Sequence, residues 1–258
     1  MKRKKEIDSQ NAVADRALDI LLSFTDDHPV LTATELQTRA GFSRSTIYRY
    51  IASLRSKGLI IEDSGGGYRL GPRLIQMARI ARQGNPVIEL ALPHMKDMSE
   101  ICGELIQLSE RVDKETIVLE VLEGRHRIGI TYMRGQVLPS PAGSSAKVML
   151  AFAPDDEREE LLSMVTLHAY TPNSITDPAA FRAELDTIQR NGYAINNEEI
   201  DVGIRAIAAP IRGRRGVNHA ISIVGPTFRM TDEKIPEYTT LVKDRAARIS
   251  DSMLSAGF

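Results

Sequence analysis

The stretch that decides the fold runs Gly41-Phe42-Ser43-Arg44-Ser45-Thr46-Ile47-Tyr48-Arg49-Tyr50-Ile51. Gly41 can adopt the positive φ that a tight turn between two helices requires. Ser43 is a good N-cap, because its hydroxyl can accept hydrogen bonds from the first free N–H groups of a helix. Apolar residues then recur at helical spacing, which indicates one buried stripe: Ile47, Ile51 and Leu54.

The opposite face of this helix carries cationic and hydrogen-bonding side chains, crowded into its first two turns: Arg44, Ser45, Thr46, Tyr48 and Arg49. Such a face is typical of a recognition helix whose N-terminal end enters a DNA major groove. A surface helix with a basic face would have the same composition. The segments on either side decide between the two interpretations.

The segments before the stretch predict the first half of a helix-turn-helix. Residues 11–26 carry apolar side chains at helical spacing. Thr32 and Glu35 have the spacing of a capping box, in which the threonine caps and the glutamate reaches back. This box opens a short second helix before Gly41. Two helices joined by a tight turn that contains glycine make a helix-turn-helix.

The segments after the stretch predict a wing. Lys57-Gly58 ends the helix with a cation and a glycine. Residues 59–61 and 68–70 have the composition of short strands, and the triple glycine 65–67 between them predicts a hairpin. Arg69 on this hairpin can lie along phosphates. The glycines also suggest a nucleotide-binding loop, but they lack the G-x-G-x-x-G spacing and the lysine of a P-loop.

The charge of the chain is distributed unevenly. Residues 1–84 hold 14 Lys and Arg against 9 Asp and Glu, whereas residues 85–258 hold 19 against 25. The positive excess favours a polyanionic partner for the N-terminal third. A single cysteine, Cys102, excludes an internal disulfide and fits a reducing, cytoplasmic compartment. No apolar run approaches the roughly 18 residues of a membrane span.

The rest of the chain predicts a mixed α+β domain. Residues 72–84 and 86–101 have helical spacing and are separated by Asn85-Pro86. Six strand-like runs and four further helices follow, which predicts helices around one sheet. The expected strands are 105–108, 116–121, 128–133, 193–195, 204–209 and 219–224, and the expected helices are 145–152, 155–164, 178–191 and one beginning at Thr231-Asp232.

From about residue 11 to residue 254, the chain resembles the IclR family of bacterial transcription regulators. The resemblance rests on six segments: Arg16–Leu21, Gly41–Arg49, Gly67–Leu74, Arg190–Ala194, Gly203–Ile211 and Ser222–Pro226. It implies a winged helix-turn-helix over 1–71, a linker helix over 72–85 and a GAF-like effector-binding domain over 86–258. It also implies operator DNA and a small catabolite as partners, a homodimer or dimer of dimers, and no cofactor, metal or membrane partner.

The resemblance also implies where the effector binds. The family's pocket combines a loop before a helix, here Pro139–Lys147, with the three C-terminal segments. Several polar residues common in the family are replaced, since Asn196 stands at a frequent acidic position, Ala206 at a cysteine and Val224 at a serine. These changes disfavour a very small acid such as glyoxylate and favour an aromatic or amide-like ligand. The expected lining is Met133, Gly143, Ser144, Ser145, Asn196, Ala206, Ser222 and Val224.

An enzyme is the alternative interpretation. Ser144-Ser145-Ala146-Lys147 matches S-x-x-K, in which Lys147 would act as the base for the nucleophile Ser144 in a hydrolase. The partner motifs S-D-N and K-T-G are absent, as is a G-x-S-x-G elbow, and the five histidines share no metal spacing. Lys147 fits a salt bridge or a pocket edge better, so the sequence favours a regulator over an enzyme.

Overall fold

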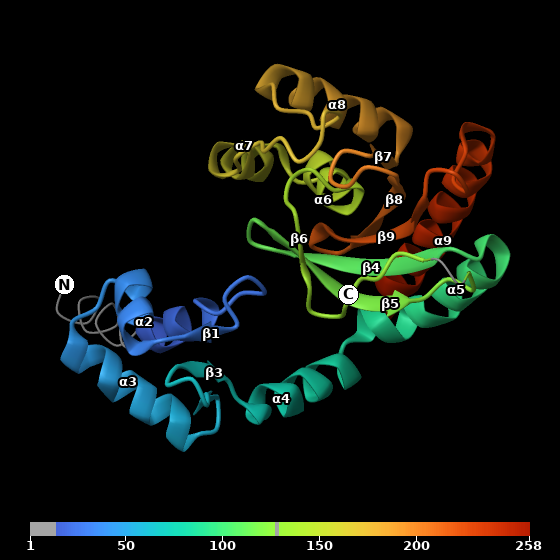
Figure 1. The fold of residues 1–258 in the computed structure, drawn as a ribbon. Coiled ribbons are helices and arrows are strands. Elements are labelled where there is room, and N and C mark those ends of the chain that lie inside the picture. Colours follow the sequence, from blue (N-terminus) through green and yellow to red (C-terminus); the bar gives the residue numbers. More distant parts are fainter. Residues whose placement is uncertain (1–13, 127–128) are drawn as a thin grey trace, which may run out of the picture. The chain divides into compact units, whose positions relative to one another are not determined.

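The computed structural model describes residues 14–126 and 129–258 (Figure 1). The chain divides into two compact units between Gly84 and Asn85, and each unit has a hydrophobic core of its own. No helix of the described residues combines the length and the apolar composition that a membrane span requires.

The N-terminal unit is a winged helix-turn-helix, as predicted. Residues 14–22 are helical. The labelled elements that follow are β1 (Val30–Leu31), α2 (Ala33–Ala40), α3 (Arg44–Ser56), β2 (Ile60–Glu62), β3 (Tyr68–Leu70) and α4 (Pro72–Gln83). The wing strands β2 and β3 pair antiparallel, and β1 adds a third strand beside β3 that the sequence did not predict.

Local hydrogen bonds explain why these helices begin and end where they do. The Thr32 hydroxyl accepts from the Glu35 N–H at 3.2 Å while the Glu35 carboxylate accepts from the Thr32 N–H at 2.7 Å, so the capping box is confirmed. Gly41 ends α2 with φ of 67°, in the left-handed region that favours glycine. The Ser43 hydroxyl accepts from the Thr46 N–H and caps α3.

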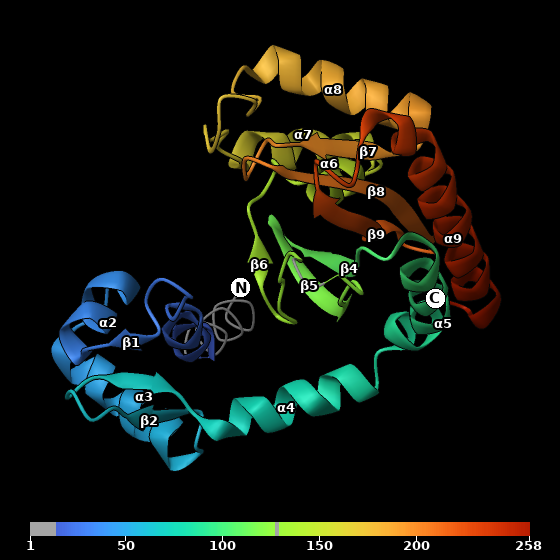
Figure 2. The same ribbon diagram turned by 45° about the vertical axis from the view of Figure 1, so that its right-hand side comes forward.

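The C-terminal unit is a six-stranded antiparallel sheet with helices on both faces (Figures 1 and 2). The strand order is β6-β5-β4-β9-β8-β7. Its strands are β4 (Leu105–Val112), β5 (Glu115–Leu122), β6 (Val137–Leu138), β7 (Ala194–Asn197), β8 (Ile204–Gly213) and β9 (Gly216–Pro226). Its helices are α5 (Pro86–Cys102), α6 (Ser144–Ala151), α7 (Asp155–Met164), α8 (Pro178–Asn191), the 3-10 turn η1 (Asp232–Lys234) and α9 (Ile235–Ala256).

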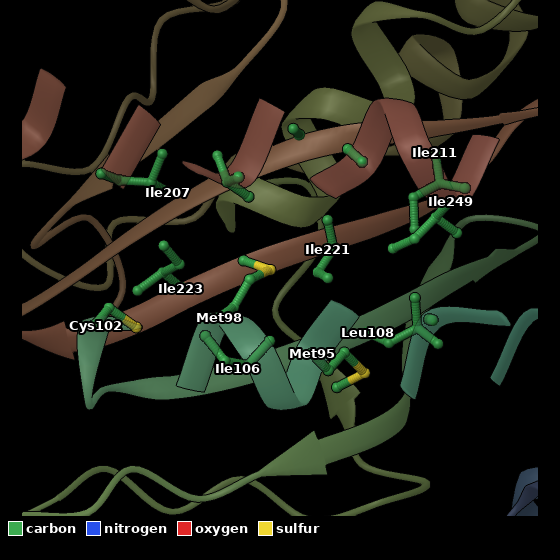
Figure 3. Packing of buried hydrophobic residues seen from close by; sticks show 14 of the residues in the cluster. Met95, Met98, Cys102, Ile106, Leu108, Ile207, Ile211, Ile221, Ile223 and Ile249 are labelled. Atoms are coloured by element: carbon green, nitrogen blue, oxygen red, sulfur yellow. The ribbon is translucent and has the colours of Figure 1, made fainter. Parts of the chain in front are cut away.

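The main core of this unit lies between the sheet and two helices, α5 and α9. Figure 3 shows Met95 and Met98 of α5 and Ile249 of α9 packed against alternate residues of β4, β8 and β9. The opposite face of the sheet carries α6, with α7 and α8 outside it (Figure 2). Because successive strand residues point to opposite faces, residues next to those in Figure 3 face α6.

One predicted strand is wrong. The strand was predicted over 128–133. Ile128 lies outside the described residues, and residues 129–133 have no regular secondary structure, although their apolar residues alternate. The edge strand β6 comes later, because the Gly135 N–H donates to the Val118 carbonyl and the Val118 N–H to the Gln136 carbonyl. These bonds attach the chain to β5 only after residue 134. Before that point Ile130 and Tyr132 pack against a buried cluster of the sheet, but their backbone does not pair as a strand.

Candidate nucleic-acid interface and candidate ligand site

The recognition helix α3 buries one face and exposes the other. The buried face consists of Ile47, Tyr50, Ile51 and Leu54, which pack with residues of the first two helices and of the wing. The exposed face includes Arg44, Ser45, Tyr48 and Arg49. Thr46 is half-buried, and its hydroxyl lies 2.9 Å from the Ser43 hydroxyl at the N-cap. Thr46 therefore supports the start of α3 more than it presents a free donor.

The exposed face of α3 keeps its positive charge available. The Arg44 guanidinium lies over the Tyr48 ring and the Arg49 guanidinium over the Tyr50 ring, with ring-centre distances of 5.8 and 5.6 Å. Among the residues that the structure describes, no carboxylate forms an ion pair with Arg44 or Arg49. Two guanidinium groups held above aromatic rings can meet either guanine edges or phosphates.

The arginines nearer the wing are in different surroundings. Arg55, at the end of α3, forms a 2.7 Å ion pair with Glu62 of β2. Arg69 of β3 lies half-exposed, with its Nε 3.7 Å from a carboxylate oxygen of Asp63. Arg55 therefore joins α3 to the wing, whereas Arg69 keeps most of its exposed donors for an outside partner.

The candidate ligand site begins at the start of α6. Gly143 is the N-cap, and it offers no side chain to the first free N–H groups of the helix. Ser144 and Ser145 follow as the first helical residues, and each is only 3% exposed. Free amides at a buried helix start favour an anionic group in their neighbourhood.

Three further predicted residues lie on the face of the sheet that carries α6. Ala206 of β8 and Val224 of β9 are paired across the two strands and belong to one buried apolar cluster. Ser222 lies two residues before Val224, so its side chain points to the same face of the sheet. The Ser222 hydroxyl is buried and has no hydrogen-bond partner within the described part of the chain. A buried hydroxyl without a partner costs free energy, and it marks a place where a ligand could supply the missing bond.

Two predicted lining residues are placed differently. The Asn196 side chain is buried, but its oxygen accepts a 2.9 Å hydrogen bond from the Glu199 N–H and so shapes the chain after β7. Met133 is 64% exposed and does not join the other residues. Its neighbour Tyr132 packs against the cluster of Ala206 and Val224 instead, and burial raises the pKa of its phenol. Met133 was expected from the family resemblance, whereas Tyr132 and Ile130 are the residues of this segment that pack against the cluster.

The sequence analysis missed two buried polar residues on this face. Gln107 of β4 is paired with Ser222 across the strands, and its amide donates a 3.0 Å hydrogen bond to the Ser109 hydroxyl. Both side chains are almost fully buried. A signal was present, because polar residues at alternate positions of an otherwise apolar strand indicate one polar, covered face.

Lys147 is a fully buried charge at the start of α6. Its ammonium donates to Glu199 at 2.6 Å, to the Ile195 carbonyl at 2.8 Å and to Glu184 at 3.3 Å, and the residue is 0% exposed. Three acceptors match the three N–H donors of an ammonium group. Burial raises the pKa of the Glu199 carboxyl, although Lys147 opposes this shift. Lys147 thus forms a salt bridge, which is one of the two roles, with a pocket edge, that the sequence favoured over a catalytic base.

We also searched the described residues for a metal site, a reactive thiol and further cavities. No group of three or more His, Cys, Asp or Glu side chains among them could hold a metal ion. Cys102 is buried, and this burial raises the pKa of its thiol. Two surface cavities of about 280 and 300 Å³ border α7, and neither is lined by the candidate ligand-site residues.

Comparisons with known proteins match both units. The family model for the C-terminal part of the bacterial transcriptional regulator IclR matches residues 81–251, and a helix-turn-helix domain model matches residues 16–69. The chain is 31% identical to the HTH-type transcriptional regulator KipR of Bacillus subtilis, over 89% of this chain and 92% of that protein.

Solved structures agree with these matches. The Thermotoga maritima IclR structure is 29% identical with a TM-score of 0.68, covering 93% of this chain and 98% of that one. An IclR homologue from Microbacterium hydrocarbonoxydans, solved in complex with 4-hydroxybenzoate, is 28% identical with a TM-score of 0.74. That match covers 93% of this chain and 98% of the homologue.

Proposed function

The chain belongs to the IclR family of transcriptional regulators, and from this we propose that it binds a palindromic operator and that a small catabolite changes its operator affinity. The observation that carries the proposal is the exposed face of α3, on which no carboxylate within residues 14–126 and 129–258 pairs with Arg44 or Arg49, while the opposite face is buried. Ser45, Tyr48 and the wing residue Arg69 add donors around this face. Because operator DNA of a bacterial regulator lies in the cytoplasm, we propose that the protein works there.

The direct test uses the DNA upstream of the protein's own gene. The full-length protein should retard this DNA at nanomolar concentration, whereas unrelated DNA of equal length should need at least about a thousandfold more protein at the same salt concentration. Candidate catabolites titrated into the complex should shift the affinity by about 5- to 150-fold, because a ligand must bind two conformations unequally to have any effect. Equal affinity for both DNAs would contradict the proposal.

The proposed assembly is a dimer, or a dimer of dimers, with α4 as part of the contact. One recognition helix reads few base pairs, so a palindrome needs two copies. Helix α4 has no buried residue, and Ile75, Met77 and Ile80 are more than half exposed. Twelve residues of helix without a packed face are marginally stable alone. A partner that covers Leu74, Met77, Ala78 and Ala81 would supply the missing contact.

A charge placed on this stripe should weaken the dimer. We expect Met77→Glu to raise the dimer dissociation constant at least about tenfold, because it buries a carboxylate without a partner. Gln76→Glu introduces the same charge one residue earlier, on the other side of α4, and should leave the dimer intact. Light scattering at micromolar concentration measures both variants. Wild-type protein that is monomeric under these conditions would refute the dimer.

The proposed effector is a small organic acid with an apolar or aromatic body. Free amides at Ser144 and Ser145 suit its carboxylate, and the cluster of Ala206 and Val224 suits its body. Ser222 and Gln107 then supply hydrogen bonds to a second polar group. The homologue solved with 4-hydroxybenzoate makes this acid the first compound to test, with glyoxylate as the contrasting small acid.

The orphaned hydroxyl of Ser222 gives a test in which stability and binding move in opposite directions. Ser222→Ala should leave the ligand-free protein unchanged or stabilise it by about 1 kcal/mol, because it removes a buried group without a partner. The same change should raise the dissociation constant of the effector by about fivefold or more. Urea unfolding and calorimetric titration measure the two effects.

The matched control is Ser250→Ala. Ser250 is also buried, but its hydroxyl accepts from the Arg212 N–H at 2.8 Å and donates to the Ala246 carbonyl at 2.6 Å. The free energy of unfolding of this control should fall by about 1–3 kcal/mol, and its effector affinity should stay unchanged. A Ser222→Ala variant that loses as much stability as Ser250→Ala would show that Ser222 has a partner and would remove it from the site.

The hydrolase alternative is weakened by the surroundings of Lys147. A general base needs a free lone pair near the nucleophile, whereas the three N–H groups of this ammonium already donate to acceptors. We therefore propose that Ser144 acts through its backbone amide and takes no part in covalent chemistry.

A further inference from the structure

The burial of the Lys147 ammonium group is energetically costly, and the need to fill space does not explain it. Removing an ammonium group from water costs several kcal/mol unless acceptors replace the lost hydration. An apolar side chain of similar length, with a neutral residue in place of Glu199, would fill the same space without this cost. The charge is present one helical turn after Ser144, in a helix whose eight residues are all buried.

The acceptors of Lys147 come from three segments that are distant in sequence. Glu184 belongs to α8, Ile195 to β7, and Glu199 to the loop between β7 and β8. A single ammonium group therefore joins the first turn of α6 to β7 and to the loop that follows it.

The loop after β7 is held in a strained conformation. Glu198 has a φ of 61°, which is uncommon for a residue other than glycine. The Thr171 hydroxyl donates to the Glu198 carbonyl at 2.6 Å, and the Ser174 hydroxyl donates to the Glu199 carbonyl at 2.7 Å. These bonds attach the loop to the segment that precedes α8, while Lys147 attaches it to α6. Strained backbone persists only where its surroundings determine it this fully.

We propose that Lys147 is a positioning residue of the effector site. Its ammonium fixes the first turn of α6 against the end of β7, so that the Ser144 and Ser145 amides keep one position relative to the sheet. Lys147 acts through these groups and does not touch the ligand. The inference rests on the proposed effector site for its purpose, but the geometry that it describes exists without a ligand.

Hydrogen exchange of the full-length protein tests this role without DNA or effector, so its result does not depend on whether the proposed function is correct. The variants are Lys147→Met and the double variant Lys147→Met/Glu199→Gln. The double variant removes both buried charges of the pair and should regain stability. The control, Arg182→Met, breaks the exposed pair of Arg182 with Glu159, outside the site.

We expect amides in 143–147 and 195–199 to exchange about tenfold faster or more in Lys147→Met, after normalisation to amides of β9. The same amides should stay fast in the double variant, because the bonds to Ile195 and Glu199 are absent there too. Arg182→Met should match the wild type. If Lys147→Met does not fold, the exchange rates of the double variant alone test the proposal. Unchanged exchange, a uniform increase across the unit, or recovery of protection in the double variant would each overturn the proposal.

Discussion

Replacing Lys147 with methionine should lower the free energy of unfolding by about 3–5 kcal/mol at neutral pH, the usual cost of removing one member of a buried ion pair. The reason is the carboxylate left behind. Glu199 is 8% exposed, and no other cation in the described residues contacts it. Methionine nearly conserves the volume, so the loss reflects the uncompensated charge rather than a cavity.

This loss should depend on pH. Burial raises the pKa of the Glu199 carboxyl above its ordinary value of 4.5, so the native state binds a proton that the unfolded chain has already released. The contribution of Glu199 to the free energy of unfolding therefore falls as the pH rises from about 4.5 through the pKa of this carboxyl in the native state. Without Lys147, whose charge lowers this pKa, the native value rises further. The cost of Lys147→Met should accordingly be small near pH 4.5 and largest at pH 7–8, where only the wild type keeps a compensated carboxylate.

Urea unfolding at the two pH values measures this effect. Lys147→Met/Glu199→Gln should recover most of the lost stability, because neutralising both members of a buried pair is often nearly neutral. Lys243→Met is the matched control, since Lys243 is exposed and donates one 2.9 Å bond to the Asn191 carbonyl. It should change stability by less than about 0.5 kcal/mol. A pH-independent loss in Lys147→Met would mean that Glu199 is not the cause.

The N-terminal unit was predictable from sequence because local interactions set its boundaries. The capping box of Thr32 and Glu35, the N-cap Ser43 and the glycine at Gly58 each act within a few residues. The strand β1 was missed because two residues carry no periodicity, and it forms only through pairing with the distant β3.

The candidate ligand site was only partly predictable, because it is made by contacts between distant segments. Ser222 was expected to face a pocket, but its missing partner depends on how α6 covers the sheet. The role of Lys147 depends on Glu199, which lies 52 residues later. Asn196 was expected to face the ligand, and its bond to the Glu199 N–H depends on the local turn after β7. Residue type alone could not distinguish these outcomes.

Replacing both Arg44 and Arg49 with alanine should produce the largest functional effect, a loss of about 2–6 kcal/mol in operator binding if each arginine contributes a typical 1–3 kcal/mol. This corresponds to a decrease in affinity of roughly 30-fold to 10⁴-fold. Both guanidinium groups lie on the exposed face near the start of α3, and the described ion pairs engage neither of them. The fold should be unaffected, because the buried stripe that holds α3 is untouched.

The single variants separate two kinds of contact. A base contact should cost affinity for the operator but little for unrelated DNA, whereas a phosphate contact should weaken both and reduce the salt slope by about one unit. Arg55→Ala is the control on the same helix, since Arg55 pairs with Glu62 of the wing and should change affinity far less. Fluorescence anisotropy with both DNAs across several salt concentrations measures these differences. If Arg44→Ala/Arg49→Ala binds the operator as tightly as Arg55→Ala does, α3 is not the helix that reads the DNA.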